Sequence, residues 1–241
     1  VPTKAIEYSI PEWLAETLEK ELGPSWEREM VALNEKAPTI LRVNTLKTTA
    51  KELVSDLRDE NVESFQIPNY PDAVQLEQKK NVFLTSAFKD GLFEVQDASS
   101  QKIGELLDVS EGMRVVDVCA GAGGKTLHLA ALMHNKGQII ALDIYEWKLA
   151  ELKRRAKRAG AHNIETRFID DNKVIKRLHE KADRLLIDAP CSGLGVLKRN
   201  PDSKWKIDQE FIDRIKKEQQ KILQDYAKIL KKGGKMVYAT C

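Results

Sequence analysis

The second half of the chain repeats one pattern, in which short apolar runs alternate with stretches of helical character. Runs rich in Val, Ile and Leu are typical of strands buried on both faces of a parallel sheet. Their alternation with helices predicts an α/β fold with helices on both faces. The expected strands lie within residues 113–118, 137–144, 165–170, 183–190 and 234–241, and the expected helices within 97–109, 125–133, 146–160, 172–180 and 207–232.

The chain before Asp97 follows a different pattern. Residues 11–23 and 24–36 predict two short helices, and the segments after them predict a strand, a helix and further strands. This order is typical of a small α+β subdomain behind a helical pair. We therefore expect two domains that pack closely, residues 1–96 and residues 97–241.

Composition excludes several classes of protein. The 241 residues contain no run of 18 apolar residues and no charged leader, so we expect neither a membrane span nor a secretory signal. Three widely spaced cysteines, Cys119, Cys191 and Cys241, favour a reducing compartment, and hence the cytoplasm, over a disulfide scaffold. The four histidines lack metal-binding spacing, so no metal is expected. We expect a monomer.

Charge is distributed unevenly along the chain. Residues 1–96 carry 11 Lys and Arg against 17 Asp and Glu, a balance of −6, whereas residues 97–241 carry 28 against 20, a balance of +8. The second half is therefore the candidate for contact with a polyanion. The signal is weak alone, because lysine-rich helices are usually solvated.

The segment CAGAGGKT, residues 119–126, raises the question of which ligand a turn after the first expected strand would hold. A phosphate-binding P-loop needs glycine at its first position, where this chain has Cys119, so nucleotide hydrolysis is disfavoured. The small residues still let an adenosine-type ligand approach the backbone at the carboxyl end of the sheet.

Acidic residues end or follow four expected strands, namely Asp117, Asp143, Asp170 and Asp188. An acid at the end of the second strand can accept hydrogen bonds from two ribose hydroxyls, which is the role we expect for Asp143. The alternative is that Asp143 only caps the next helix. The loop does not give the G-x-G-x-x-G of a dinucleotide site, so S-adenosylmethionine fits better than NAD. The expected cofactor-binding residues are Cys119, Ala120, Gly121, Ala122, Gly123, Gly124, Lys125, Asp143, Ile144, Asp170, Asp188 and Pro190.

Cys191 follows the fourth expected strand and Cys241 ends the fifth, so both are expected near the methyl donor. The alternative is that both are small buried residues, the usual state of cysteine. Turn-forming residues around Cys191 argue against a core element there.

The loop CAGAGGKT is accompanied by further motifs, ALDIYEWKL, LIDAPCSGLGVLKRNPDSKW and YATC downstream and LRVNTLK, NYPDAVQLE and FEVQDASSQ upstream. Together these motifs resemble the Sun-type RNA cytosine 5-methyltransferases, and especially their bacterial small-subunit ribosomal RNA members. The resemblance covers nearly the whole chain from Pro11. Where the family loop usually reads CAAPGGKT, this chain has Gly121 and Ala122 in place of the central Ala-Pro.

The resemblance implies a Rossmann-like S-adenosylmethionine-dependent methyltransferase domain that forms 5-methylcytosine in RNA. It implies that Cys241 is the nucleophile, which adds to carbon 6 of cytosine and activates carbon 5. Cys191 would help resolve the adduct, Asp188 would bind the base edge, and Lys125 would stabilise the intermediate or tune a thiolate. Related DNA enzymes use the Pro-Cys thiol, so the reverse assignment of the cysteines is the main alternative.

RNA would be held as a single strand or loop, because a cytosine must leave its stack to react. Residues 198–206 supply lysines and an arginine that would neutralise phosphates. In the same segment, Trp205 is expected to anchor the loop to the core, with stacking on a base as the alternative. The basic run at residues 153–158 is expected to be mostly solvated. The upstream subdomain resembles the family's RNA-binding subdomain, but its −6 balance argues against a general grip on phosphates. Any RNA contact there is expected to be shape-specific or confined to a local patch around Arg42 and Lys47.

The family continues beyond the TC motif, whereas this sequence stops at Cys241 and begins without methionine. We therefore expect a fragment that binds S-adenosylmethionine but methylates slowly or not at all, since a terminal carboxylate opposes thiolate formation. The alternative function is a noncatalytic RNA-binding or ribosome assembly factor with a methyltransferase fold.

Overall fold

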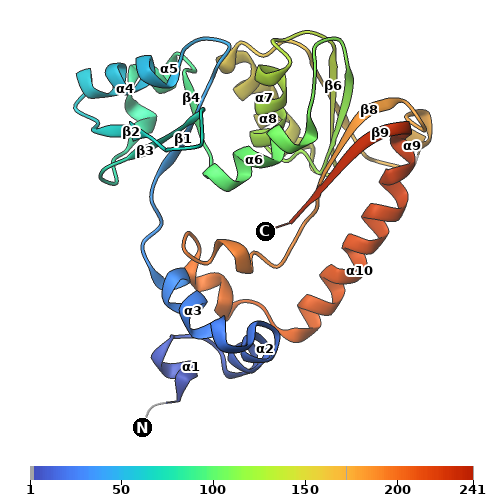
Figure 1. Cartoon of the computed structure of the whole chain (residues 1–241). Coiled ribbons are helices and arrows are strands. Elements are labelled where there is room, and N and C mark those ends of the chain that lie inside the picture. Colours follow the sequence, from blue (N-terminus) through green and yellow to red (C-terminus); the bar gives the residue numbers. More distant parts are fainter. Residues whose placement is uncertain (1–2, 172, 241) are drawn as a thin grey trace. The chain divides into compact units, whose positions relative to one another are not determined.

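The computed structural model describes residues 3–171 and 173–240 (Figure 1). Contacts divide the chain into two units, each described here by itself. The first unit contains residues 1–37 and 190–220, and the second contains residues 38–189 and 221–240. The division at residues 96 and 97 remains a prediction. No helix among the described residues is long and apolar enough to cross a membrane.

The first unit is helical. Its helices are α1 (Lys4–Glu7), α2 (Glu12–Leu22) and α3 (Trp26–Asn34), followed after a long gap in sequence by the 3-10 turns η3 (Leu194–Val196) and η4 (Pro201–Trp205) and by α10 (Gln209–Tyr226), which continues into the second unit. Both helices predicted before residue 37 are present. Their core is built on the buried Leu14, Trp26 and Met30, and Leu194 of η3 packs against it.

The second unit opens with a four-stranded antiparallel sheet in the order β2-β3-β1-β4. Its elements are β1 (Ile40–Val43), α4 (Ala50–Asp59), β2 (Ser64–Gln66), β3 (Ala73–Leu76), the turn η2 (Val82–Leu84), α5 (Ser86–Lys89) and β4 (Phe93–Val95). Thr49 begins α4 with a capping box, in which Thr49 and Glu52 each accept the other's backbone N–H. Strand β2 was not predicted, because only three residues form it and two of them are exposed.

A five-stranded parallel sheet forms the rest of the second unit, in the order β7-β6-β5-β8-β9. The elements are α6 (Ala98–Leu107), β5 (Arg114–Val118), α7 (Gly124–Leu132), β6 (Gln138–Asp143), α8 (Glu146–Ala159), β7 (Ile164–Phe168), α9 (Lys173–Arg177), β8 (Ala182–Asp188), η5 (Ala227–Ile229) and β9 (Leu230–Ala239). All five predicted strands and the helices between them are present, and the predicted α/β class with a small N-terminal domain is confirmed.

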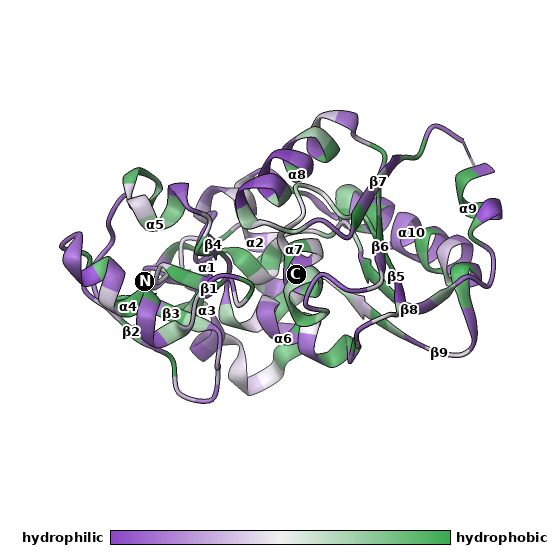
Figure 2. Cartoon of the chain, turned by 90° about the horizontal axis from the view of Figure 1, so that it is seen from above, coloured by the Kyte–Doolittle hydropathy of each residue, from purple (hydrophilic) through white to green (hydrophobic). Residues whose placement is uncertain are grey.

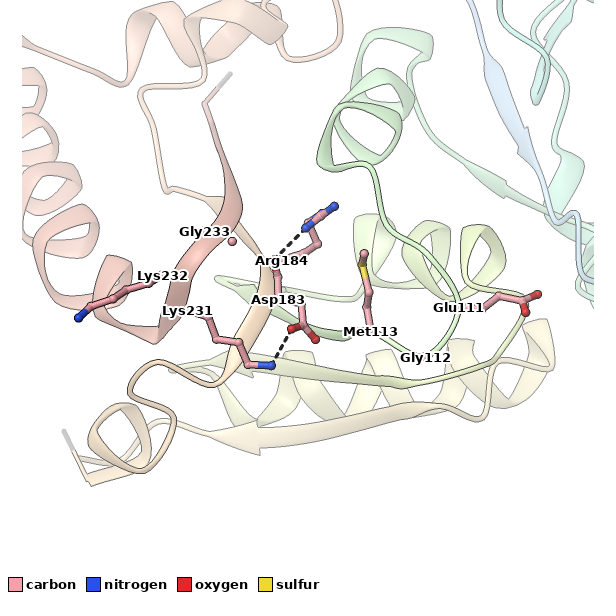
Figure 3. Close-up of a pocket in the computed structure, with 9 residues that line it drawn as sticks. Glu111, Gly112, Met113, Asp183, Arg184, Lys231, Lys232 and Gly233 are labelled. Carbon is pink, nitrogen blue, oxygen red and sulfur yellow. Dashed lines mark hydrogen bonds and ion pairs between the residues drawn. The ribbon is translucent and has the colours of Figure 1, made fainter.

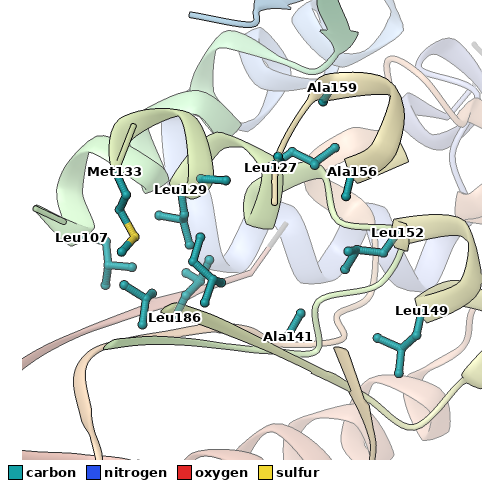
Figure 4. Close-up of a cluster of buried hydrophobic side chains, with 14 residues drawn as sticks. Leu107, Leu127, Leu129, Met133, Ala141, Leu149, Leu152, Ala156, Ala159 and Leu186 are labelled. Carbon is teal, nitrogen blue, oxygen red and sulfur yellow. The ribbon is translucent and has the colours of Figure 1, made fainter. Parts of the chain in front are cut away.

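Alternate residues of the parallel strands build a core on each face of the sheet. On one face, Val115 and Ile139 pack with side chains of α6, α7 and α8, including Leu129 and Leu152 (Figure 4). On the other face, strand residues such as Val116 pack with α9 and the last turns of α10. Hydrophobic residues accordingly follow the strands, whereas much of α8 is hydrophilic (Figure 2). The predicted burial of both faces is therefore observed.

The strand order creates a switch point between β5 and β8. From β5 the chain moves outward to β6 and β7, and it then returns to the opposite side of β5 to form β8 and β9. The connections after β5 and β8 therefore leave the sheet in opposite directions. Ligands of open parallel sheets bind at such a point, beyond the carboxyl ends of the strands.

Candidate functional site

The loop from Cys119 to Gly123 joins β5 to α7 at the switch point. Cys119, Gly121 and Gly123 have φ values of 62°, 55° and 87°, in the left-handed region that favours glycine. A side chain at Gly123 would stand 2.5 Å from Leu152 of α8, so this position also needs glycine for packing. The loop thus turns tightly back on itself, and Gly123 N–H donates to the Ala120 carbonyl at 3.0 Å.

Asp143 at the end of β6 holds this loop. Its two carboxylate oxygens accept hydrogen bonds from the N–H groups of Gly121 at 2.8 Å and Tyr145 at 2.9 Å. Helix α8 has Tyr145 as its N-cap, so Asp143 does not occupy the capping position considered from the sequence. Each carboxylate oxygen has a second lone pair. The arrangement therefore leaves acceptor capacity for a ligand beside Gly121.

Asp117 lies beneath the loop and is 1% exposed. Thr126 Oγ1 donates to its Oδ2 at 2.6 Å, and its Oδ1 has no hydrogen-bond partner in the described part of the chain. Burial, reinforced by the nearby Asp188 and Asp143 carboxylates and opposed by Thr126 and Lys125, raises the pKa of Asp117 to about 7. The sequence placed this acid at a strand end without assigning it a role.

Lys125 and Asp188, both predicted catalytic residues, form an ion pair. Lys125 Nζ lies 2.6 Å from Asp188 Oδ2, and the two side chains are 16% and 34% exposed. Lys125 stands in the first turn of α7 and Asp188 ends β8, so the pair lies at the switch point. A partly exposed ion pair there can hold a charged or polar substrate group without a large conformational change.

The remaining predicted residues of the second unit follow the same carboxyl edge. Ile144, directly after β6, is 51% exposed, and Tyr145 beside it is 48% exposed. Asp170 is exposed two residues after β7. Strands β6 and β7 are neighbours, with Asp143 and Phe168 in register. These side chains are accessible to a ligand that lies across the strand ends.

Other predicted residues belong to the first unit or lie outside the described residues. Cys191 is half-buried, and the Pro190 carbonyl accepts a hydrogen bond from Gln219. Cys241 lies outside the described residues. The expectation that Trp205 anchors its loop is wrong, because Trp205 is 57% exposed. Lys204 is buried instead, at 6% exposure, and donates to Asn34.

The loop fits the nucleoside cofactor expected from the sequence. A side-chain carbon at Gly121 would meet no atom within 4 Å, and one at Gly124 would meet only Gln96, at 3.8 Å. The backbone of the loop is therefore approachable beside the Asp143 carboxylate. A small residue next to an acid at this edge is the combination that adenosine-type ligands require.

Two arginines contact this loop or the helix that follows it, which the sequence did not predict. Arg42, expected in a local patch for RNA, is 3% exposed and donates to the Gly124 carbonyl. Lys47 of the same expected patch is exposed, and its Nζ donates to the carbonyls of Asp90 and Arg158. Arg155, in the run expected to be solvated, donates to the Ala122 carbonyl at 2.8 Å. No local signal marks these contacts, because they join residues 33 to 111 positions apart.

A surface hollow lies at the opposite, amino edge of the parallel sheet (Figure 3). Both of its acids are paired with lysine: Asp183 lies 2.6 Å from Nζ of Lys231, which also lines the hollow, and Glu111 lies 2.9 Å from Nζ of Lys136, which does not. Lysine neighbours hold the pKa values of Asp183 and Glu111 below their usual range. Its internally paired charges make it a weaker candidate than the carboxyl edge.

Comparison with known proteins identifies the family to which the chain is similar. A family model described as "16S rRNA methyltransferase RsmB/F" matches residues 105–241, more than half of the chain. A second model, described as an RsmF/B-like ferredoxin-like domain, matches residues 10–83. The two matches cover the parallel sheet and most of the chain before it.

Individual relatives extend over nearly the whole chain. Probable ribosomal RNA small subunit methyltransferases B of a Synechocystis species and of Bacillus subtilis are each 36% identical over 98% of the chain, which spans 53% of each relative. A methyltransferase homologue from Pyrococcus horikoshii has a TM-score of 0.84 and 30% identity, covering 99% of this chain and 75% of that one. NSun6 from Pyrococcus horikoshii, crystallised with the S-adenosylmethionine analogue SFG, shares the fold, with a TM-score of 0.87 and 22% identity over 96% of this chain and 83% of its own.

Proposed function

The chain belongs to the family of the 16S rRNA methyltransferases RsmB/F, and from this premise we propose that it methylates carbon 5 of a cytosine in small-subunit ribosomal RNA. S-adenosylmethionine is the proposed methyl donor. One observation carries the proposal: the Lys125–Asp188 ion pair stands at the switch point, beside a loop that Asp143 holds open to a ligand. The proposal includes a cytoplasmic location and a catalytic domain that begins near residue 97.

The cofactor would be held by the loop and by the ends of β6 and β8. Asp143 has lone pairs for the ribose hydroxyls, and the exposed Ile144 offers an apolar surface for the adenine. When bound, S-adenosylmethionine supplies a methyl group carried on a positively charged sulfonium. Asp143 and Asp188 bring carboxylates to this edge, with Asp188 paired to Lys125, whereas burial favours the neutral form of Asp117.

The proposed chemistry uses a thiolate to make carbon 5 of cytosine nucleophilic. The sulfur electron pair of Cys241 forms a bond to carbon 6, and the electrons of the 5,6 double bond then take up the methyl group at carbon 5. Loss of the carbon 5 proton and cleavage of the sulfur–carbon bond restore the double bond. We assign assistance in this elimination to Cys191.

Asp188 is the proposed contact for the base. Its side chain is one-third exposed, so a carboxylate oxygen can meet the amino and ring nitrogen edge of cytosine while Lys125 stays within reach of the other. The lysine would then balance the charge that develops on the ring during addition of the thiolate. This role requires the base to leave its stack, which favours a single-stranded or loop target.

The segment 198–206 is the proposed support for the RNA strand. Trp205 is exposed, so its ring can stack on a base, and Arg199, six residues earlier in the same segment, is also exposed. Lys198 is engaged with Glu35 at 3.0 Å. The exposed aromatic ring and the basic residues together form the kind of platform that holds single-stranded nucleic acid.

The decisive test is transfer of labelled methyl from S-adenosylmethionine to unmodified small-subunit ribosomal RNA, with nucleoside analysis of the product. Because the chain spans 53% of its relatives' length, residues 1–241 are compared with a chain of the relatives' full length. We expect the label in 5-methylcytosine with the longer chain and slow or no transfer with residues 1–241 alone. Label in a different nucleoside would contradict the cytosine assignment. Cofactor binding without transfer by either chain would favour the noncatalytic assembly factor over the enzyme.

Cysteine roles are tested with RNA that carries 5-fluorocytosine, because fluorine at carbon 5 cannot leave as the proton does and the adduct persists. We expect Cys191→Ala to retain the protein–RNA adduct and Cys241→Ala to lose it. An adduct that survives Cys241→Ala but not Cys191→Ala would reverse the two assignments.

A further inference from the structure

A buried acid of the small antiparallel sheet binds two arginines of α8. Glu94 in β4 is 4% exposed, and its Oε2 accepts from Arg155 Nη2 at 2.8 Å and Nε at 3.2 Å. Arg158 forms an ion pair with the other carboxylate oxygen. A buried carboxylate is costly unless it is paired, and these two guanidinium groups provide the pairing. Glu94 therefore fixes the orientation of both arginines.

Arg155 also reaches the loop between β5 and α7. Its third nitrogen, Nη1, donates to the Ala122 carbonyl at 2.8 Å. The planar guanidinium has its donors in a fixed fork, so orienting one side against Glu94 also orients the side that faces the loop. One side chain thus links the small sheet to the candidate cofactor loop.

Arg42 of β1 makes a second link of the same kind. Its Nη1 donates to the Gly124 carbonyl and to the side-chain oxygen of Gln96. Burial lowers the pKa of Arg42 to about 10, and the Glu94 charge opposes that shift, so the guanidinium stays protonated at neutral pH. Burying the charged Arg42 costs more free energy than burying an uncharged side chain would. Its guanidinium is directed at the carbonyl of Gly124, the first residue of α7.

Holding these carbonyls determines where the neighbouring N–H groups point. In a trans peptide unit the carbonyl and the following N–H point in opposite directions. Fixing the Gly124 carbonyl therefore fixes the Lys125 N–H, which belongs to the first turn of α7 and has no acceptor within the helix. The same restraint sets the base of the Lys125 side chain, whose Nζ meets Asp188.

We propose that Arg42 and Arg155 are positioning residues that orient the cofactor loop, so that the small antiparallel sheet braces the S-adenosylmethionine site. This inference rests on the proposed function, because it assigns the loop to that cofactor. It gives the sheet a role that does not depend on RNA contact.

Arg158 supplies a matched control. It pairs with the same Glu94 and packs 3.9 Å from the centre of the Phe88 ring, but among the described residues no hydrogen bond from its side chain reaches the loop. Arg155→Lys and Arg158→Lys both keep a positive charge near Glu94 and both lose the fork. Only the first loses the contact with Ala122.

The experiment measures the affinity of S-adenosylhomocysteine, by calorimetry, for the wild type and for Arg155→Lys, Arg42→Lys and Arg158→Lys. We expect affinity about tenfold weaker for the first two variants, the scale of one lost charged hydrogen bond, and within about twofold of the wild type for the third. In methyl transfer, KM for S-adenosylmethionine should rise while KM for RNA stays constant. Thermal melting should show similar losses of stability for Arg155→Lys and Arg158→Lys.

Equal affinities for all four proteins would overturn the inference, as would a KM for RNA that rises with KM for the cofactor. If Arg155→Lys or Arg42→Lys does not fold, Gln96→Leu gives a milder test, because it removes the acceptor that helps to hold Arg42. Unchanged affinity in that variant would count against the role of Arg42. Failure of the wild type to bind would instead contradict the proposed function.

Discussion

The two edges of the parallel sheet carry similar residues in opposite arrangements. At the amino edge, Asp183 and Glu111 each face lysine, and their pKa values are lowered. At the carboxyl edge, Asp117 is buried near two further carboxylates, and its pKa is raised to about 7. The acids of the amino edge are paired with lysine, whereas at the carboxyl edge one oxygen of Asp117 has no hydrogen-bond partner among the described residues. Acids whose pKa values are shifted by burial and by neighbouring charges cluster at functional sites.

The comparison is sharpest within β8, which carries an acid at each end. We expect Asp188→Asn to lower the rate of methyl transfer about a thousandfold, because it removes the partner of Lys125 and the proposed contact for the base. Asp183→Asn changes the same strand at the amino edge and should leave the rate within about twofold. Single-turnover transfer with saturating cofactor measures both. Equal losses would show that the two edges do not differ in function.

The next largest effect is expected from Asp117, whose ionisation should make the free energy of unfolding depend on pH. Its folded pKa of about 7 lies above the ordinary value of 3.8, so the folded state binds more protons than the unfolded state between these pH values. Its contribution to stability is therefore complete below pH 4 and is lost as pH rises toward 7. The loss is on the order of 4 kcal/mol, which follows from a shift of about three units.

The test compares denaturant unfolding of the wild type and Asp117→Asn across pH 4 to 8. Asparagine keeps an oxygen for Thr126 and cannot ionise. We expect the difference in unfolding free energy to move in favour of the variant as pH rises and to level off above pH 7. A difference that is constant with pH would mean that Asp117 ionises normally in the folded protein.

Asp143 should contribute mainly to cofactor affinity. Asp143→Asn keeps one acceptor oxygen and replaces the other by an NH2 group. That nitrogen cannot accept a hydrogen bond from a backbone N–H or from a ribose hydroxyl, so one of the contacts to Gly121 and Tyr145 is lost. We expect binding of S-adenosylhomocysteine to weaken about thirtyfold, which corresponds to about 2 kcal/mol. Glu111→Gln at the amino edge is the control, with unchanged affinity expected. Calorimetry that finds both variants normal would remove Asp143 from the site.

The sequence predicted the carboxyl edge well because parallel strands end at a common edge. Once residues 113–118, 137–144 and 183–190 are recognised as strands, their terminal acids must lie together, and Lys125 follows as the start of the next helix. A P-loop was disfavoured on equally local grounds, because Cys119 occupies the position that needs glycine. The hydrophobic pattern of each strand or helix and the turn residues next to it are local features of the sequence, so they predict this edge without knowledge of the tertiary structure.

The contacts of Arg42 and Arg155 were beyond the same reasoning. From sequence alone, an arginine in a strand or in a basic helix is predicted to be exposed. Only the tertiary structure brings Arg42 to the Gly124 carbonyl and Arg155 to the Ala122 carbonyl, which are distant in sequence. The exposure of Trp205 and the burial of its neighbour Lys204 were not predicted, for a similar reason. Within the short turn η4, no periodicity decides which neighbour is buried.

The smallest effect is expected where the amino edge is already balanced. The Lys231–Asp183 pair is partly exposed, at 47% and 32%, so its contribution should be about 0.5 kcal/mol after screening by solvent and salt. Because the pKa of Asp183 is lowered, that contribution is present at neutral pH and is lost in acid as Asp183 becomes protonated. Lys231→Met should therefore reduce stability slightly at pH 7, less at pH 3, and leave methyl transfer unchanged. A marked loss of transfer in this variant would show that the amino edge also serves the reaction, and the contrast between the two edges would no longer separate structure from function.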